Sequence, residues 1–358
     1  MDKLTKIAIV GLGAVSKKHI AAVRKFSTAL QLVAVVDSRA DLVNKVSQDL
    51  GVAGFEQLEK MFEDTEVDIV VLCTPNWLHA QQTILCIKHA KHVVVEKPIA
   101  VAWNDGLAVQ KAVKNSKLNL WIVQQHRVNP VLKLLKQTID AKNFGRIFQV
   151  NINVFWTRLQ AYYDAAAWRG SRIMDGGALM NQASHTVDLL HWLFGPVQTI
   201  QAMWATQARQ IETEDSCVLN IRWKQGTLGS MNISTLVYPR NLETSITVIG
   251  EKGTVKLTGL ASHEISHWEF ADFTIDAEEI RKINQQAAQF VEQSHYHYYA
   301  NLIEEITSKT SFLPDVTEGL KTLEILIAAQ QAAMTEVTVQ LPLMIETDAC
   351  IRDTLYIS

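Results

Sequence analysis

The sequence has few cysteines, no excess of positive charge and no long apolar run. Its four cysteines lie far apart and form no Cys-x-x-Cys pair, which argues against a zinc knuckle and against a disulfide scaffold. Lys and Arg number 34 against 37 Asp and Glu, so the net charge of −3 disfavours a nucleic-acid partner. No stretch of about 18 apolar residues appears, and the N-terminal apolar run is too short for a signal peptide. We therefore expect a cytoplasmic protein without a membrane partner.

The composition is that of a globular protein. Apolar residues make up 48% and charged residues 20% of the chain, which excludes a disordered chain and a coiled-coil rod. At about 150 residues per domain, a chain of this size suggests two domains. Internal repeats and Gly/Pro/Ser-rich linkers are absent from the sequence.

A glycine-rich turn follows the first apolar segment. Residues 6–10 are rich in β-branched side chains and predict a strand buried on both faces of a parallel sheet. Gly11 permits a tight turn, and Gly13 lets backbone N–H groups approach a pyrophosphate at the N-terminus of the next helix, where an anion is favoured. Ser16 takes the third position of the glycine motif. The pattern predicts a dinucleotide-binding turn that contains Gly11, Gly13, Ala14 and Val15.

An acidic residue ends the next expected strand, about 20 residues beyond the turn. That strand spans residues 32–36 and is followed by Asp37, Ser38 and Arg39. A carboxylate at this position binds the ribose hydroxyls of the adenosine half and repels a 2′-phosphate. Arg39 is ambiguous, because an arginine here either holds that phosphate or stacks on adenine. The motif favours NAD over NADP as cofactor; the alternative is that Asp37 is a surface residue at a strand end.

The alternation of strands and helices continues to residue 123. We expect strands at 67–73, 92–95 and 118–123 and helices at 78–89 and 102–113, as in a doubly wound parallel sheet. In such a sheet the carboxyl ends of the strands line the ligand crevice. The segments that follow these strands should therefore face the cofactor, and they contain Thr74, Pro75, Asn76, His79, Glu96, Lys97 and Gln125.

The glycine turn, the TPN segment with its following His, and the EKP segment resemble the Gfo/Idh/MocA family of nicotinamide-dependent sugar and polyol oxidoreductases. The resemblance covers nearly the whole chain. It implies that the turn at residues 74–76 borders the nicotinamide and that Lys97 lies in the active site. It also implies a cis bond before Pro98, a geometry that is energetically accessible only before proline. The alternative is a surface lysine before a turn proline.

Beyond residue 122, successive strands replace the alternating pattern. We expect strands at residues 147–155, 197–204, 216–223, 227–234 and 243–249, with hairpin signals at Gly226 and at residues 250–253. These features predict an α+β domain with an open, mainly antiparallel sheet. The expected fold class is α/β, with a Rossmann domain over residues 1–122 and a substrate-binding and oligomerisation domain over residues 123–358.

Residues 175–190 combine a glycine pair with an expected helix. Asn181 and His185 are four residues apart, which places both on one helix face. A structural role for His185, with Asp188 as its hydrogen-bond partner, is the alternative. His185, Asp188 and His191 make a poor metal set, because His191 lies far round the helix from His185, and we expect no metal. The segment resembles the second signature of the same family, in which an Asp and, four residues on, a His act with the EKP lysine.

The resemblance implies a hydride transfer in which Lys97 and His185 act on the substrate hydroxyl. We expect His185 to accept the hydroxyl proton, while Lys97 hydrogen-bonds the same oxygen and stabilises alkoxide charge. The two roles can be exchanged, because burial and the nicotinamide cation lower the pKa of a lysine below its free value of about 10.4. Asn181 replaces the usual Asp, and a neutral amide neither raises the basicity of His185 nor accepts a proton.

A narrower resemblance involves residues 155–182 and 241–244. It is to the subgroup that oxidises UDP-N-acetylglucosaminuronic acid at C3, in which Asn at position 181 is expected, and it implies a role in bacterial surface polysaccharide (O-antigen, lipopolysaccharide) synthesis. Guanidinium groups suit the carboxylate and diphosphate of such a UDP-sugar. An Arg beside aromatic side chains also packs on them as a structural cation–π pair. The expected substrate-binding residues are Lys97, Arg158, Tyr163, Trp168, Arg169, Asn181, His185 and Arg240.

The C-terminal region predicts further helices. Residues 291–306 suit a helix whose His and Tyr side chains at 295–299 pack against the protein rather than bind a metal, and Asp315 is an expected N-cap of the next helix. Subunits of the family cover the open sheet face for each other, so we expect a homodimer or homotetramer.

The runner-up function is a dehydrogenase or reductase of a free sugar or inositol. An alternative of a different functional class is a non-catalytic NAD-binding sensor. The presence of both Lys97 and His185 argues against it.

Overall fold

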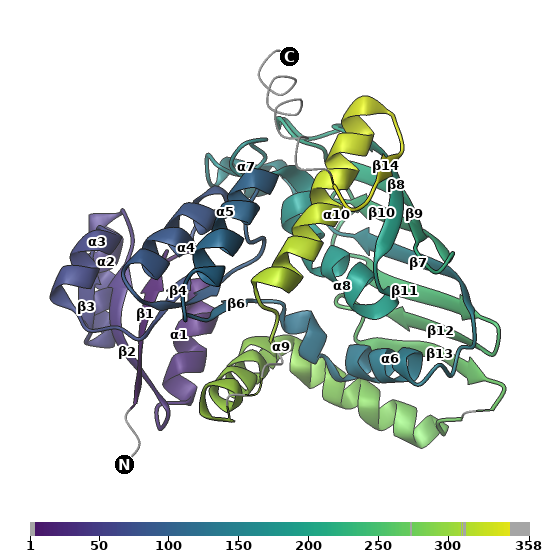
Figure 1. The fold of residues 1–358 in the computed structure, drawn as a ribbon, viewed down its shortest axis with the longest axis horizontal. Helices are drawn as coiled ribbons and strands as arrows, with labels where there is room; N and C mark the ends of the chain where they lie inside the picture. The colour runs from purple at the N-terminus through teal and green to yellow at the C-terminus, as the bar shows by residue number, and fades with distance from the viewer. Residues whose placement is uncertain (1–3, 273, 309, 311–312, 344–358) are drawn as a thin grey trace. The chain divides into compact units, whose positions relative to one another are not determined.

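The structure is a computed structural model that describes residues 4–272, 274–308, 310 and 313–343 (Figure 1). The chain forms two compact units. Residues up to Gln125 together with His295–Leu320 make up the first, and His126–Ser294 together with the chain from Lys321 onward make up the second. The long helix α9 (Ala277–Ser308) therefore contributes residues to both units. The expected domain division after residue 122 stays a prediction.

The first unit is built on a six-stranded parallel sheet, as the alternating pattern predicts. Its strands lie in the order β3-β2-β1-β4-β5-β6, that of a Rossmann fold. In the centre, Ile9 of β1 lies opposite Val35 of β2 and Val71 of β4, and all three side chains are fully buried. The apolar runs thus reflect burial on both faces of the sheet. The strands β1 to β6 span Thr5–Val10, Leu30–Val36, Ala53–Phe55, Ile69–Leu72, His92–Val95 and Leu120–Ile122.

The sequence analysis assigned no elements to residues 40–64, which form α2, β3 and α3. Strand β3 has three residues, none of them buried, so it carries no apolar pattern from which a strand is predicted. The helices of this unit span Ser16–Lys25, Ala40–Leu50, Leu58–Asp64, His79–Lys88 and Trp103–Lys114 (α1 to α5), with short turns at Asn76–Leu78 (η1) and Gln125–Val128 (η2, which continues into the second unit).

Helix α9 completes the core of the first unit. Tyr298, Tyr299 and Leu302 are fully buried and belong to the same apolar cluster as the central strands. The packed face expected for residues 295–299 is therefore confirmed for the two tyrosines. The helix is longer than the predicted segment, since it begins at Ala277 rather than at residue 291.

The second unit contains an eight-stranded sheet in the order β13-β12-β11-β7-β10-β9-β8-β14. Its neighbouring strands are antiparallel except for β7 and β10, which run parallel, so the expected open and mainly antiparallel sheet is confirmed. Buried and exposed side chains alternate along β9, as in a sheet with one covered face. The strands β7 to β14 span Ile147–Phe155, Val197–Ala205, Ser216–Trp223, Leu228–Ser234, Glu243–Gly250, Gly253–Thr258, Glu264–Phe270 and Val339–Gln340.

Helix α8 (Ser184–Phe194) is almost wholly buried, and the Leu190 carbonyl accepts a hydrogen bond from the Trp223 indole of the sheet. This contact fixes α8 on the sheet. The Asp315 carboxylate accepts hydrogen bonds from the backbone N–H groups of Thr317 and Glu318, which confirms the expected N-cap. The remaining helices and helical turns span Pro130–Asp140 (α6), Gln160–Asp164 (α7), Ala178–Gln182 (η3) and Val316–Thr335 (α10).

Candidate active site

Glycine occupies the two positions of the first turn for different structural reasons. Gly11 has a φ of +87°, and a Cβ there would lie 2.8 Å from backbone atoms of Cys73 and Thr74. Gly13 is exposed, and a Cβ there would meet no described atom within 4 Å. The fold itself therefore requires glycine at position 11. At position 13 the open space suits the approach of a pyrophosphate to the backbone, so the residues present fit a dinucleotide.

Asp37 is buried at the carboxyl end of β2 and faces this turn. Its Oδ2 accepts a hydrogen bond of 2.7 Å from the backbone N–H of Leu12. Arg39 donates to both carboxylate oxygens through Nε and Nη2. Burial opposes ionisation, but the hydrogen bonds from Arg39 and Leu12 outweigh it and lower the pKa of Asp37 below its ordinary value. The carboxylate is thus held as an anion beside the glycine turn.

His79 connects the two polar turns that the sequence singled out. Its ring nitrogens lie 2.7 Å from the carbonyl oxygen of Pro98 and 2.8 Å from that of Thr74. Burial lowers the pKa of His79, so the neutral ring carries one N–H and donates to one carbonyl at a time. The Lys97–Pro98 bond is cis, as the resemblance implied. The placement of His79 is structural: it sets the TPN turn against the EKP segment within the first unit.

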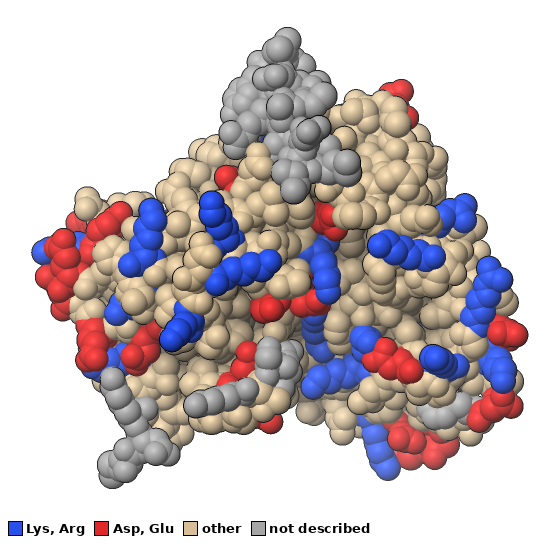
Figure 2. Space-filling view, viewed as in Figure 1, with Lys and Arg blue, Asp and Glu red and all other residues tan. Residues whose placement is uncertain are grey.

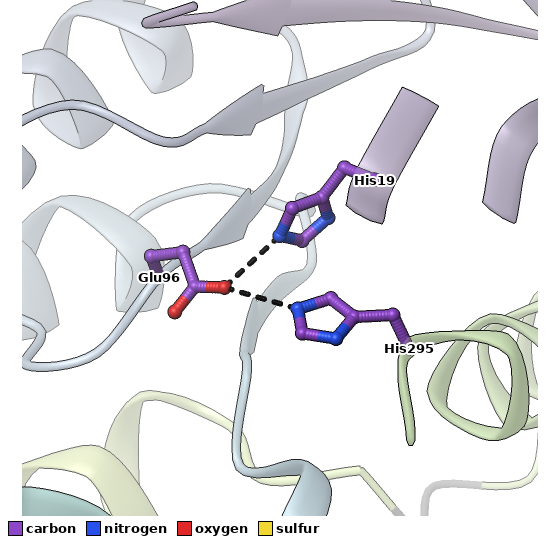
Figure 3. Close-up of side chains that lie close together, drawn as sticks. All are labelled: His19, Glu96 and His295. Carbon is purple, nitrogen blue, oxygen red and sulfur yellow. Dashed lines mark hydrogen bonds and ion pairs between the residues drawn. The ribbon is translucent and has the colours of Figure 1, made fainter. Parts of the chain in front are cut away.

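Glu96 lies between two buried histidines in the first unit (Figure 3). Its Oε1 is 3.0 Å from Nε2 of His19, on α1, and 3.5 Å from Nε2 of His295, on α9. The Nδ1 of His19 contacts the Tyr299 hydroxyl at 3.0 Å. Burial raises the pKa of Glu96, but the two imidazoles outweigh this effect and hold it well below its ordinary value.

Two histidines and a carboxylate are also a metal-ligand set. The three ligand atoms lie within 4.8 Å of one another, and they are engaged in the hydrogen bonds just described. No sequence pattern predicts this convergence, because His19 and His295 are separated from Glu96 by 77 and 199 residues. The network joins the helix after the glycine turn, the residue before Lys97 and helix α9.

In the second unit, the structure corrects the expectation that Asn181 and His185 share one helix face. Residues Ala178–Gln182 form a π-helical turn, and α8 begins only at Ser184. The reason is Gly177, with a φ of +93°, whose missing Cβ leaves room for the Glu214 carboxylate. Glu214 accepts a hydrogen bond of 2.7 Å from the backbone N–H of Leu179 and so fixes the start of the turn. Irregular turns of this kind occur often at functional sites.

Asn181 and His185 each have a defined neighbour. Asn181 donates from Nδ2 to Oδ1 of Asp175 at 2.5 Å. The His185 ring stacks on that of His126, with centroids 4.8 Å apart. Asp188, the partner considered for His185, instead forms a buried ion pair with Arg127, with an Nε to Oδ2 distance of 2.7 Å. Asp175, His126 and Arg127 are not predicted site residues, because no spacing pattern connects them to Asn181 or His185.

Arg158 and Arg169 surround the ring of Tyr162. Their guanidinium carbons lie 5.4 Å and 4.3 Å from its centroid. Arg158 donates to the side-chain oxygen of Gln182, and burial lowers its pKa. Arg169 donates to the Tyr162 carbonyl, and its buried Nε has no hydrogen-bond acceptor among the described residues. The arrangement brings two cations to one aromatic ring, and the buried Nε–H of Arg169 has no acceptor among the described residues.

The other expected substrate residues lie in different environments. Tyr163 is buried, and its hydroxyl lies 3.4 Å from the Thr235 hydroxyl. Trp168 is half-buried beside the Arg169 guanidinium, and Arg240 is exposed between β10 and β11. Ser38 is exposed at the end of β2, and Thr74 donates to Gln82.

Positive and negative side chains are mixed on the visible face, as the nearly equal numbers of basic and acidic residues lead one to expect. Figure 2 shows Lys and Arg interspersed with Asp and Glu, with no continuous basic surface on that face. None of the helices in the described part of the chain combines the length and the apolar character needed to cross a bilayer.

Two family models match most of the chain. Residues 5–124 match the NAD-binding Rossmann fold of the Gfo/Idh/MocA oxidoreductase family, and residues 136–341 match its C-terminal alpha/beta domain. The chain belongs to this family. The match of residues 5–124 to the NAD-binding Rossmann fold of this oxidoreductase family makes NAD the cofactor and the chain an NAD-dependent dehydrogenase.

Two solved members of the Gfo/Idh/MocA family resemble the chain over nearly its full length. The WlbA dehydrogenase of Bordetella pertussis, crystallised with NADH and UDP-GlcNAcA, is 42% identical with a TM-score of 0.94, covering 96% of this chain and 99% of that one. The WlbA dehydrogenase of Chromobacterium violaceum, crystallised with the same two ligands, is 44% identical with a TM-score of 0.91, covering 96% and 97%. A more distant relative, the NADP(+)-dependent scyllo-inositol 2-dehydrogenase of Bacillus subtilis, is 23% identical, covering 94% of this chain and 96% of its own.

Proposed function

We propose that this enzyme oxidises the C3 hydroxyl of UDP-N-acetylglucosaminuronic acid (UDP-GlcNAcA) to a 3-keto sugar nucleotide, in the synthesis of a bacterial surface polysaccharide such as O-antigen. The observation that carries the proposal is the similarity, at 42% and 44% identity over 96% of the chain, to two dehydrogenases crystallised with this sugar nucleotide. The arginine pair around Tyr162 supports it, because a substrate with a diphosphate and a carboxylate needs such cations.

The chemistry assigned to this chain is proton transfer and charge stabilisation. NAD, when bound, supplies the hydride acceptor. His185 accepts the proton of the substrate hydroxyl, and its stacking on His126 sets the plane of the ring. Lys97 hydrogen-bonds the same oxygen and stabilises the developing alkoxide. Asn181 orients the sugar, and Arg158, Arg169 and Arg240 bind the diphosphate and carboxylate, with Trp168 and Tyr163 beside the rings.

The test is an NADH-absorbance assay with UDP-GlcNAcA, glucose and myo-inositol as substrates. We expect turnover of the sugar nucleotide alone, and a loss of about 10²- to 10⁴-fold in kcat for Lys97→Met and for His185→Gln with the fold intact. Turnover of inositol or glucose alone would support the runner-up, a free polyol dehydrogenase, which the inositol dehydrogenases among the relatives favour. NAD binding without turnover of any of the three would support a sensor.

We also propose that the enzyme is a homodimer or homotetramer in the cytoplasm. The face of the second sheet opposite α8 exposes Met203, Val218, Leu228 and Ile249, with 69%, 40%, 48% and 38% of each accessible. These apolar side chains are interspersed with polar ones on the same face, such as Arg222 opposite Leu228 and Asn232 opposite Val218. Exposed apolar side chains on one sheet face favour a protein partner, and a second copy of the chain is the proposed one. Light scattering at micromolar protein should give a multiple of the 40.1 kDa chain mass, and a Met203→Glu, Val218→Glu variant should give a smaller species; a monomeric wild type would contradict the proposal.

A further inference from the structure

Asp175 is a buried carboxylate that no established role explains. Only 2% of the residue is exposed. Its Oδ1 accepts the 2.5 Å hydrogen bond from Nδ2 of Asn181, and its Oδ2 accepts one of 2.8 Å from the backbone N–H of Gly170. Both oxygens of the carboxylate therefore contact segments that carry proposed substrate residues, namely Asn181 itself and the residue that follows Arg169.

The contact with Asn181 determines which way its amide faces. An ionised carboxylate accepts hydrogen bonds and donates none. The amide of Asn181 must therefore turn Nδ2 toward Asp175, which directs Oδ1 away from it. The side chain at position 181 consequently turns an oxygen to the side opposite Asp175, as an aspartate there would.

The second contact holds the loop that carries Arg169. Gly170 has a φ of +74°, and a Cβ there would lie 2.5 Å from the Ile211 side chain. Its carbonyl accepts hydrogen bonds from the Thr213 hydroxyl and the Glu212 backbone N–H. With Asp175 on its N–H, both polar groups of the Gly170 backbone have partners. One buried side chain thus joins the Arg169 loop to the π-helical turn of Asn181.

A second buried carboxyl group, Glu214, borders the same turn. Its pKa is raised to about 7, chiefly by burial and in part by Asp175, so it is protonated more readily than a surface carboxyl group. Glu214 accepts from the backbone of Leu179 and Asp175 accepts from the side chain of Asn181, so the two acidic residues hold different parts of the π-helical turn.

We propose that Asp175 is a positioning residue that locks the Asn181 amide with its oxygen toward the substrate. This inference rests on the proposed function, in which Asn181 contacts the sugar. It predicts that the two side chains act together. Activity requires a hydrogen bond between positions 175 and 181 that leaves an acceptor atom of residue 181 facing the substrate.

The test exchanges the two side chains. In Asp175→Asn, the new Nδ2 faces position 181, turns the Asn181 amide round and presents a donor to the substrate. We expect kcat with UDP-GlcNAcA to fall about 10- to 100-fold, while the dissociation constant for NAD stays within about twofold, since the Asp37 site lies in the other unit. Adding Asn181→Asp restores an acceptor at position 181, and this double variant should regain at least about tenfold in kcat over Asp175→Asn.

A purely structural role gives a different result. Asp215→Asn is a matched control, because Asp215 is also a buried carboxylate and accepts hydrogen bonds from the backbone N–H groups of Gln207, Ala208 and Arg209. It should lower Tm and leave kcat within about twofold. A double variant no more active than Asp175→Asn, or an Asp175→Asn variant with wild-type kcat, would overturn the inference.

A second cycle tests whether Asp175 acts through the Asn181 amide. In an Asn181→Ala background the amide is gone, so Asp175→Asn should change kcat less than about twofold, and a larger drop would overturn the inference. If wild-type enzyme does not turn over UDP-GlcNAcA at all, the proposed function fails; if it does and the exchange gives no rescue, the inference alone fails.

Discussion

Arg39 pairs with Asp37 through two parallel hydrogen bonds, from Nε to Oδ1 and from Nη2 to Oδ2, each 2.8 Å long. The sequence left open whether this arginine holds a 2′-phosphate or stacks on adenine. In the structure its guanidinium instead pairs with the carboxylate of Asp37, the residue that we expect to bind the ribose hydroxyls. The Arg39 side chain is 62% exposed, so the pair is held by Asp37, of which 8% is exposed, rather than by burial of the arginine.

Removing Asp37 should therefore weaken the preference for NAD. In Asp37→Ser the ribose hydroxyls lose their acceptor, and Arg39 is released to meet a 2′-phosphate. We expect the ratio of kcat/KM for NAD to that for NADP to fall at least about tenfold, which corresponds to about 1.4 kcal/mol. Steady-state rates with each cofactor measure it. Adding Arg39→Ala should reverse the gain with NADP, and an unchanged ratio in Asp37→Ser would show that Asp37 does not read the ribose.

The two turn glycines should separate folding from cofactor binding. Gly11→Ala forces a side chain into a positive φ and against backbone atoms 2.8 Å away, and such strain is worth about 1–3 kcal/mol. We expect a clear fall in Tm of the cofactor-free protein. Gly13→Ala meets no described atom within 4 Å, so its Tm should stay at the wild-type value. Its dissociation constant for NAD, from fluorescence titration, should rise at least about tenfold, because the methyl group occupies the approach of the pyrophosphate. Wild-type affinity in Gly13→Ala would place the pyrophosphate elsewhere.

Arg169 separates a binding role from a packing role. If its Nε meets a substrate anion, Arg169→Ala removes a charged hydrogen bond worth about 1.5–3 kcal/mol, and KM for UDP-GlcNAcA should rise about 10- to 100-fold. The KM for NAD should not change. Arg281→Ala, at an exposed position of α9, is the matched control and should leave both constants unchanged. A fall in Tm with an unchanged KM would instead assign Arg169 to the stack on Tyr162.

Glu214 should give the enzyme a measurable pH-dependence of stability. Burial raises its pKa to about 7 in the folded protein, against about 4.3 in the unfolded chain. Between these values the folded state binds more protons than the unfolded state, so its contribution to the free energy of unfolding falls as pH rises and is fully present only below about pH 4.3. Gln mimics the protonated form and keeps an acceptor for the Leu179 N–H. Glu214→Gln should therefore gain Tm relative to wild type at pH 8 compared with pH 5. Parallel Tm curves for the two proteins over that range would contradict the raised pKa.

Local patterns were sufficient for most of the fold because the driving interactions are local or repetitive. Burial on both faces of the sheet is enough to explain the β-branched runs of β1, β4 and β5. The positive φ of the tight turn is enough to explain Gly11. Segments with weak patterns were missed, notably β3, whose three residues are not buried. The helix expected through Asn181 and His185 failed at Gly177, because the Glu214 carboxylate occupies the space beside it and holds the turn, and no periodicity reveals that contact.

The sequence by itself determined the Rossmann strands, the glycine turn after β1 and the acid after β2, since each depends on residue type and short spacing. The proposed catalytic pair, Lys97 and His185, came from the resemblance of their segments to those of a known family. Only the tertiary structure decided what surrounds them. Glu96 meets His295 from 199 positions away, and Asp175 faces the amide of Asn181 across a glycine turn. Such contacts form because buried polar groups need hydrogen-bond partners, and the packed chain supplies these from residues far apart in the sequence. Sequence spacing therefore does not predict them.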